Sequence, residues 1–130
     1  MTNPIKTIQH DPLTHQVIGS AIEVHRALGP GLLESAYEEC FCWELKHNGF
    51  TVQRQVPLPV IYKQVRLNVG YRIDLIVNQE LIIELKTVDK LMPIHEAQLL
   101  TYMRLSKISK GLLMNFHLPV LRDGIKRMVL

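Results

Sequence analysis

Apolar residues recur at steps of three and four near the start of the chain, at Leu13, Val17, Ala21, Val24 and Leu28. This is the spacing of one helical face, and it predicts a first helix over residues 12–28. Gly29-Pro30-Gly31 then breaks the chain. A second helix is predicted from Leu33 to His47, ending before Asn48-Gly49. Its expected apolar side consists of Leu33, Tyr37, Cys40, Phe41 and Leu45.

After Phe50 the pattern becomes that of an extended chain. Valines at 52, 56 and 60, interrupted by Pro57 and Pro59, predict a strand near the edge of a sheet rather than in its centre. Residues 65–69 are predicted to belong to a connecting strand. The other predicted elements are a β-hairpin of residues 70–77 and 81–86 with a turn at Asn78-Gln79-Glu80, a third helix over 93–106, and strands at 111–116 and 125–129.

The composition fits one globular domain spanning residues 1–130, with residues 1–11 as an N-terminal tail. Of the 130 residues, 47% are apolar and 21% charged, which excludes a disordered chain. No apolar run approaches the roughly 20 residues of a membrane span, so we expect a cytoplasmic protein without a membrane partner. Cys40 and Cys42 are two apart in a predicted helix, where they point to different faces, so a disulfide between them is not expected.

Three charged residues interrupt the predicted hairpin. Its strands are otherwise apolar on both faces, as expected of central strands covered by helices on both sides. One face is expected to carry Ile73, Leu75 and Val77, and the other Ile76 and Ile82. Asp74, Glu84 and Lys86 break these runs, and strand alternation places Glu84 and Lys86 on the same face.

The length of the turn sets the register of the hairpin. With a three-residue turn, Val77 pairs with Leu81, and counting back three positions on each strand puts Asp74 opposite Glu84. Two opposed, buried carboxylates destabilise a sheet unless a cation lies between them. Mg²⁺ prefers such oxygen ligands, and Lys86 would act on an attacking water or on the developing charge of a phosphate. This pattern favours a phosphodiester hydrolase.

The same charges have two non-catalytic interpretations. Lys86 could neutralise the carboxylates in a buried ion-pair network, or both strands could be edge strands whose charges are solvated. The spacing alone does not choose between them, because D-x9-E-x-K is short and recurs by chance.

Two motifs resemble a known family. Gly31-Leu32-Leu33-Glu34-Ser35-Ala36-Tyr37 matches the G-x-x-E-x-x-Y signature of the GxxExxY protein family. The hairpin motif Ile73-Asp74…Glu84-Leu85-Lys86 resembles the core of the PD-(D/E)XK nuclease superfamily, to which that family is assigned, with Ile73 in place of the proline. The resemblance extends from about Val17 onward. It implies a restriction-endonuclease-like α/β fold, in which a mixed central β-sheet is flanked by α-helices in three layers (α/β/α).

The resemblance also implies a Mg²⁺- or Mn²⁺-dependent nuclease. Its catalytic residues would be Glu34, Asp74, Glu84 and Lys86, with the metal held by Asp74 and Glu84 and assisted by Glu34. Glu34 and Tyr37 are three apart on one helical face, so both could point at the hairpin. Without the resemblance, Glu34 would be a favourably placed acid in a first helical turn.

Gln98 and Tyr102, four apart on the third helix, resemble an auxiliary motif of related nucleases. Together with Tyr37 they are expected to support the substrate or a site water. The alternative is that Tyr102 is a core residue and Gln98 is solvated. His25 and His95 are left out of the catalytic set, because a lone histidine is more often structural or exposed.

Nucleic acid is the expected partner, recognised through its backbone or shape. The net charge is +3, and candidate phosphate contacts are Lys63, Arg66, Arg72, Lys86, Lys90, Arg104, Lys107 and Lys110. The sequence does not choose between DNA and RNA. The alternative function is a non-catalytic nucleic-acid-binding or protein-interaction module that retains the fold. A chain this short is also a candidate for a homo-oligomer or a larger complex.

Overall fold

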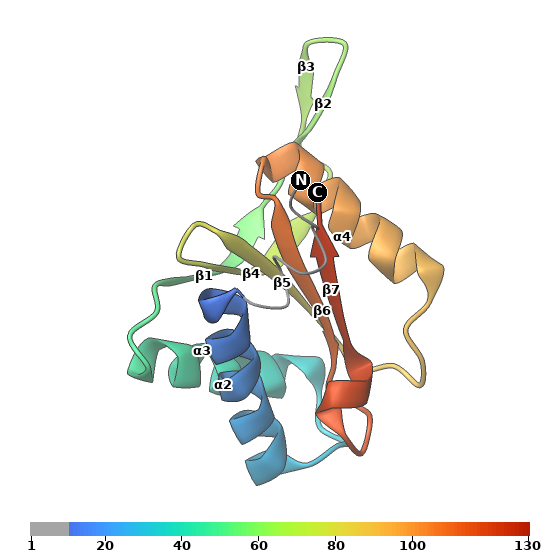
Figure 1. The fold of residues 1–130 in the computed structure, drawn as a ribbon. Coiled ribbons are helices and arrows are strands. Elements are labelled where there is room, and N and C mark those ends of the chain that lie inside the picture. Colours follow the sequence, from blue (N-terminus) through green and yellow to red (C-terminus); the bar gives the residue numbers. More distant parts are fainter. Residues whose placement is uncertain (1–10) are drawn as a thin grey trace, which may run out of the picture.

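The computed structural model describes residues 11–130, and Figure 1 shows the course of the chain. The predicted tail at residues 1–11 therefore lies outside the described residues, apart from Asp11. Asp11 caps helix α2 (Pro12–Leu28), because its carboxylate accepts a hydrogen bond from the backbone N–H of Thr14. Helix α2 has the bounds that the apolar spacing predicts.

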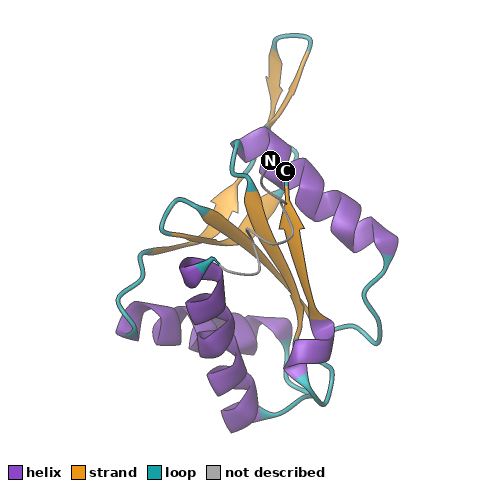
Figure 2. Cartoon of the chain, viewed as in Figure 1, coloured by secondary structure: helices purple, strands orange, loops and turns teal. Residues whose placement is uncertain are grey.

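A mixed five-stranded sheet forms the centre of the fold (Figure 2). Its strands, in spatial order, are β1 (Val52–Pro57), β4 (Arg72–Val77), β5 (Leu81–Lys86), β6 (Lys110–Asn115) and β7 (Ile125–Val129). Strands β5 and β6 are parallel, and the other neighbours are antiparallel. Helix α4 (Pro93–Ser106) makes the crossover between the parallel pair. The predicted mixed sheet is confirmed.

Helices cover both faces of this sheet and form the two outer layers (Figure 1). Helices α2 and α3 (Glu34–His47) pack against one face, and α4 packs against the other. The first core includes Val17, Tyr37, Phe41, Leu75, Val77, Ile83 and Phe116. The second includes Ile73, Ile76, Ile82, Leu99, Tyr102 and Leu113. This arrangement confirms the predicted three-layer α/β/α architecture.

The buried side of α3 differs from the prediction. Leu33 is the exposed cap residue before the helix, and Cys40 is also exposed. The buried side is centred on Phe41 and Leu45, and Cys40 lies beyond its edge. Cys40 and Cys42 are both free, as expected.

The predicted edge strand is divided in two. Its first part, β1, lies at the edge of the large sheet, as the prolines predict. The second part, β2 (Val60–Tyr62), pairs with β3 (Val65–Leu67) in a separate two-stranded sheet that projects from the body of the protein (Figure 1). We call this β2–β3 hairpin the arm.

Two short features complete the fold. The 3₁₀ helix η1 (Leu121–Gly124) connects β6 to β7. Gly111 of β6 allows close packing of α4, because a Cβ atom there would lie 2.7 Å from Met103 Sδ. Within residues 11–130, no helix has the length and apolar character needed to cross a membrane.

Candidate functional site

The candidate site lies where β4 and β5 separate. The two strands pair from Val77↔Leu81 to Leu75↔Ile83, which confirms the predicted register. Beyond that point β4 continues to Arg72 and β5 continues to Lys86, but the two strands no longer pair with each other. Asp74 and Glu84 are the first residues past the last pair, so they lie at a fork in the centre of the sheet.

At the fork, each carboxylate binds the backbone of the other strand. The backbone N–H of Asp74 donates to Glu84 Oε2 at 2.8 Å, and the N–H of Leu85 donates to Asp74 Oδ2 at 2.8 Å. These bonds replace the next ladder hydrogen bonds and use one oxygen of each carboxylate. Of the other two oxygens, Asp74 Oδ1 accepts a 3.3 Å bond from Gln55. The two carboxyl groups are also close enough to share a hydrogen bond, which raises the pKa of Glu84 and lowers that of Asp74.

The regular strand alternation ends at Asp74. Leu75 and Val77 share a face, as predicted, and pack on the α2–α3 side of the sheet. Ile73 instead packs in the core on the α4 side. Opposite Asp74, Gln55 of β1 has a φ of 49° and takes no part in the ladder, although both of its neighbours do. The prediction that Ile73 shares a face with Leu75 is therefore wrong, because the backbone is irregular at this position.

The fork is unfavourable for two negative charges. Burial, followed by the charge of Asp74, raises the pKa of Glu84 to about 8. Burial also raises the pKa of Asp74, and the charge of Glu38 adds to this effect. A carboxylate pair of this kind needs a bound proton or a cation to be stable.

Lys86 lies two residues beyond Glu84. Its positive charge lowers the pKa of Glu84, but by less than burial and the charge of Asp74 raise it. None of the ion pairs within 4.0 Å in residues 11–130 includes Lys86. The interpretation of the three charges as a tight ion-pair network is therefore not supported. The edge-strand interpretation is wrong, because β4 and β5 both have neighbours on each side.

Glu34 begins α3 and is half-buried. Burial raises its pKa, the charge of Asp74 raises it further, and the charge of Lys86 lowers it. These couplings show that the start of α3 approaches the fork. The structure thus brings Glu34 into the electrostatic environment of Asp74 and Lys86.

Tyr37 is fully buried and packs on Phe116, with ring centroids 4.8 Å apart. Its hydroxyl donates to the carbonyl of Gly29 and accepts from the N–H of Leu32 at 3.1 Å. Tyr37 thereby fixes the loop that leads into α3 and positions Glu34. A direct contact between Tyr37 and substrate stays a prediction.

Gln98 and Tyr102 lie together on α4, where Gln98 Nε2 donates to Tyr102 Oη at 3.0 Å. Tyr102 is only 4% exposed, and burial raises its pKa, with further contributions from the charges of Glu84, Tyr71 and Asp74. The fork is thus approached by α3 from one face of the sheet and by α4 from the other.

Sequence reasoning missed two residues at the site. Glu38, one turn after Glu34, is buried and accepts hydrogen bonds from Arg54 at 3.0 Å and from Gln55 at 2.7 Å. Gln55 connects Glu38 to Asp74. A positive φ at a residue other than glycine is a strain often found at functional sites, but nothing in the sequence around Gln55 signals it.

The donor set fits a hard divalent cation. Residues 11–130 contain no group of three or more His, Cys, Asp and Glu side chains arranged to hold a metal ion. The fork instead offers two carboxylates with available oxygens. Mg²⁺ typically keeps several waters and binds one or two protein carboxylates together with substrate phosphate. The place of Glu34 as a third ligand stays a prediction.

His25 and His95 have structural roles. Nε2 of buried His25 lies 2.8 Å from the carbonyl oxygen of Leu118. His95 Nδ1 accepts from the N–H of Met92 at the start of α4. Among the candidate phosphate contacts, Lys110 pairs with Asp11 at 3.1 Å and lies opposite Leu81, at the far end of β5 from Lys86.

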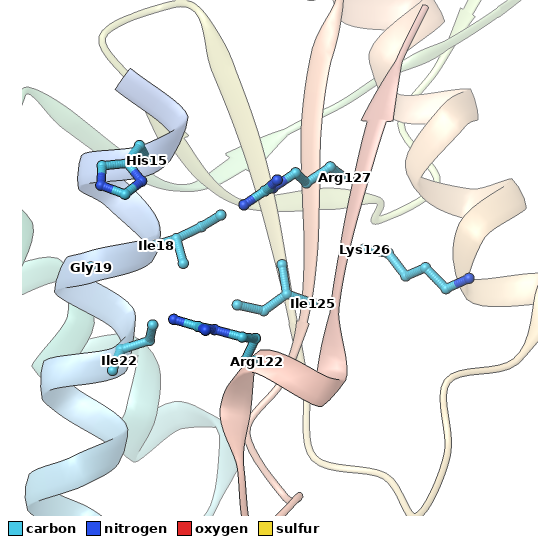
Figure 3. Close-up of a pocket in the computed structure, with 8 residues that line it drawn as sticks. All are labelled: His15, Ile18, Gly19, Ile22, Arg122, Ile125, Lys126 and Arg127. Atoms are coloured by element: carbon cyan, nitrogen blue, oxygen red, sulfur yellow. The ribbon is translucent and has the colours of Figure 1, made fainter. Parts of the chain in front are cut away.

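Two of the open grooves on the surface have similar volumes but lie in different places. One, of about 720 Å³, runs between α2 and the η1–β7 segment, away from the carboxylates. Figure 3 shows Arg122 and Arg127 extending toward α2 in this groove, whereas Lys126 points away. The other, of about 700 Å³, is partly lined by Gln98 and Tyr102 and therefore adjoins the fork.

The mixed sheet and its central fork define a restriction-endonuclease-like α/β protein. A model of the PD-(D/E)XK nuclease superfamily matches residues 11–128, and the chain belongs to that superfamily. Comparison with curated proteins found no match. Among solved structures, the chain is similar to the crystal structure of SSO0001, with 22% identity and a TM-score of 0.53. The match covers 94% of this chain and 59% of the other, so this chain spans less than two thirds of that chain's length, and the likeness concerns the fold alone.

Proposed function

We propose that the protein is a metal-dependent phosphodiesterase, a nuclease that hydrolyses the backbone of nucleic acid. The observation that carries this proposal is the fork, where Asp74 and Glu84 face each other with one oxygen each not used by the backbone. Membership of the PD-(D/E)XK nuclease superfamily supports the reaction class.

The proposed metal is Mg²⁺ or Mn²⁺, held by Asp74 and Glu84 with help from Glu34. When bound, the cation would polarise a phosphoryl oxygen and lower the pKa of a bound water. The chain's own contribution is to hold two carboxylates in place through backbone hydrogen bonds. The pKa of Glu84 is raised to about 8 by burial and by the charge of Asp74, so this carboxyl holds a proton at neutral pH when no other cation is present.

Lys86 is proposed to stabilise charge on the phosphate or to position the attacking water. Its ammonium group has no carboxylate partner within 4.0 Å in the described residues, so it is available to a substrate oxygen. Gln98 and Tyr102 are proposed to contact substrate from the α4 side.

Glu34 and Tyr37 would then be the functional core of the G-x-x-E-x-x-Y motif. We propose that the chain belongs to the GxxExxY group of the superfamily, with Tyr37 placing the helix that carries Glu34. The cytoplasmic location and the assembly state stay predictions from the sequence.

The test combines metal binding with cleavage. Mg²⁺ and Mn²⁺ are titrated calorimetrically into wild type, Asp74→Asn and Asp123→Asn, and each protein is incubated with labelled single- and double-stranded DNA and RNA. Asp123 is an exposed acid of η1, so its substitution removes the same charge away from the fork.

We expect metal heat and cleavage in wild type and Asp123→Asn, and neither in Asp74→Asn. Wild type that neither binds metal nor cleaves would refute the nuclease proposal. Tight oligonucleotide binding without cleavage would instead support the non-catalytic module.

A further inference from the structure

The groove beside the fork is largely apolar. It lies between α4 and the base of the arm, and its lining includes Val60, Tyr71, Ile94, Gln98, Tyr102 and Leu105. Its volume of about 700 Å³ is within the usual range of small-molecule sites. Ligand sites typically combine a mainly apolar lining with a few polar groups, as this groove does.

Two tyrosines give the groove its aromatic character. Tyr102 is 4% exposed, whereas Tyr71 is 47% exposed. Their ring centroids are 6.2 Å apart and the rings are tilted by 58°. A flat ligand entering the groove would therefore meet the accessible ring of Tyr71 above a fixed aromatic neighbour.

The groove lies beside the candidate metal centre, although neither carboxylate lines it. Tyr71 directly precedes β4 and is three residues before Asp74. Tyr102 is electrostatically coupled to both Glu84 and Asp74. A molecule in the groove would thus extend toward the two carboxylates.

The wall of the groove that faces α4 is free of acidic residues, whereas α4 itself carries Glu96. From Thr51 to Ile73 there is no Asp or Glu, whereas Lys63, Arg66 and Arg72 are present and exposed. The arm is exposed along β3 and carries Ile61 and Tyr62 on its surface. A two-stranded hairpin with this exposure is only marginally stable in water and gains from a partner. Apolar and aromatic groups among cations match a polyanion that also presents flat bases.

We propose that this groove receives one unpaired base of a nucleic-acid strand whose backbone crosses the Asp74–Glu84 fork. The substrate of the proposed nuclease is therefore single-stranded or frayed nucleic acid. A base within a duplex has no free face to offer to Tyr71, and it enters a groove only after it leaves the stack. Gln98 and Thr101 on the rim supply polar atoms for the edge of the base. The cleavage of such a strand rests on the proposed function, whereas the binding of a base in the groove does not.

The test measures binding by fluorescence anisotropy, using the full chain in EDTA so that no cleavage occurs. The probes are a short labelled DNA strand, the same strand with every base removed, the corresponding RNA strand and a blunt DNA duplex. All measurements are made at one ionic strength, because phosphate contacts depend strongly on salt. The abasic strand has the same charge as the normal strand, so it separates base stacking from electrostatic attraction.

Tyr71→Ala removes the accessible ring, and Tyr71→Phe retains it. Trp43→Ala is the matched control, since Trp43 is an aromatic residue of α3 that is 63% exposed and lies outside the groove. Ile94→Ser alters the rim at a residue that is 70% exposed, so it tests the groove even if Tyr71→Ala unfolds the protein. Circular dichroism melting monitors the folding of each variant.

We expect wild type to bind the normal strand about tenfold more tightly than the abasic strand, as the loss of one stacked base predicts. Tyr71→Ala should remove this preference and leave abasic binding unchanged. Tyr71→Phe and Trp43→Ala should retain it, and Ile94→Ser should reduce it. Single strands should bind more tightly than the duplex.

Equal affinity of wild type for normal and abasic strands would overturn the inference. A Tyr71→Ala variant that loses affinity for both strands equally would also contradict it. Sedimentation tests the other occupant: a wild-type dimer that Tyr71→Ala dissociates would make the groove an interface between two copies. If base preference is present but metal-dependent cleavage is absent, the proposed function fails and the groove assignment stands.

Discussion

Replacing Glu84 by glutamine should stabilise the metal-free protein at neutral and alkaline pH. The side chain of glutamine has the same size, its oxygen can still accept from the N–H of Asp74, and it carries no charge. The pKa of Glu84 rises from its ordinary value of 4.5 to about 8 in the folded protein. Between these two pH values, the folded protein keeps a proton that the unfolded chain has released. The free energy of unfolding of wild type therefore falls as the pH rises from 4.5 to about 8.

The size of the effect follows from the pKa. At about 1.4 kcal/mol per pKa unit, the ionisation of Glu84 costs roughly 4 kcal/mol of stability at pH 8. Part of this cost belongs to the Asp74–Glu84 pair rather than to one residue. We expect Glu84→Gln to regain about 2–4 kcal/mol, which raises the melting temperature by roughly 5–15 °C in a domain of this size.

The assay is thermal unfolding of wild type and Glu84→Gln in EDTA from pH 5 to pH 9. Wild type should lose stability from pH 5 up to about pH 8 and change little beyond it, and the variant should change much less throughout. Saturating Mn²⁺ should then stabilise wild type more than the variant. Glu80→Gln is the control, because Glu80 is an exposed acid in the turn of the same hairpin. A variant that melts at or below the wild-type temperature at pH 8 would refute the reasoning, as would a wild-type melting temperature that does not depend on pH.

Three further predictions concern other parts of the molecule. Lys86→Met should lower the cleavage rate about 100-fold or more, because the positive charge that stabilises the phosphate is lost. The heat of metal binding should be retained, because both carboxylates remain. Single-turnover kinetics measures the first effect and calorimetry the second. Gly111→Ala should destabilise the protein by about 1–3 kcal/mol, because the added Cβ meets Met103 Sδ at 2.7 Å; urea unfolding measures the change, and an unchanged midpoint would contradict it. Arg66→Ala should weaken the salt dependence of single-strand binding, since one phosphate contact is lost. The slope of log K against log salt should become smaller by about 0.7. An unchanged slope would mean that the arm does not contact the nucleic-acid backbone.

The elements with strong local signals were predictable from the sequence. The bounds of α2 and α4 follow from apolar spacing and from Pro93 at the start of α4. The length of the turn was enough to fix the β4–β5 register, and so to place Asp74 near Glu84. The α/β/α layers follow from strands that are apolar on both faces.

The shape of the site was not predictable, because it depends on side chains that take over backbone hydrogen bonds. Counting residues along a regular hairpin places Asp74 opposite Glu84, but it does not reveal that the strands separate there. The irregular backbone at Asp74 also explains why Ile73 packs on the α4 side rather than with Leu75. Gln55 and Glu38 gave no signal, since their roles arise only when β1, β4 and α3 come together.

The hydrogen bonds at the fork also affect how acidic residues in related chains should be interpreted. Asp74 and Glu84 each satisfy a backbone N–H of the facing strand, and a buried N–H without a partner costs about 1–3 kcal/mol. A descendant of this chain that no longer cleaved nucleic acid would still need an acceptor at both positions. It could keep the two acids, or exchange them for amides, for reasons of folding alone. The presence of both acids is therefore a weak criterion for activity within such a lineage, and an unpaired lysine at position 86 is the more informative one.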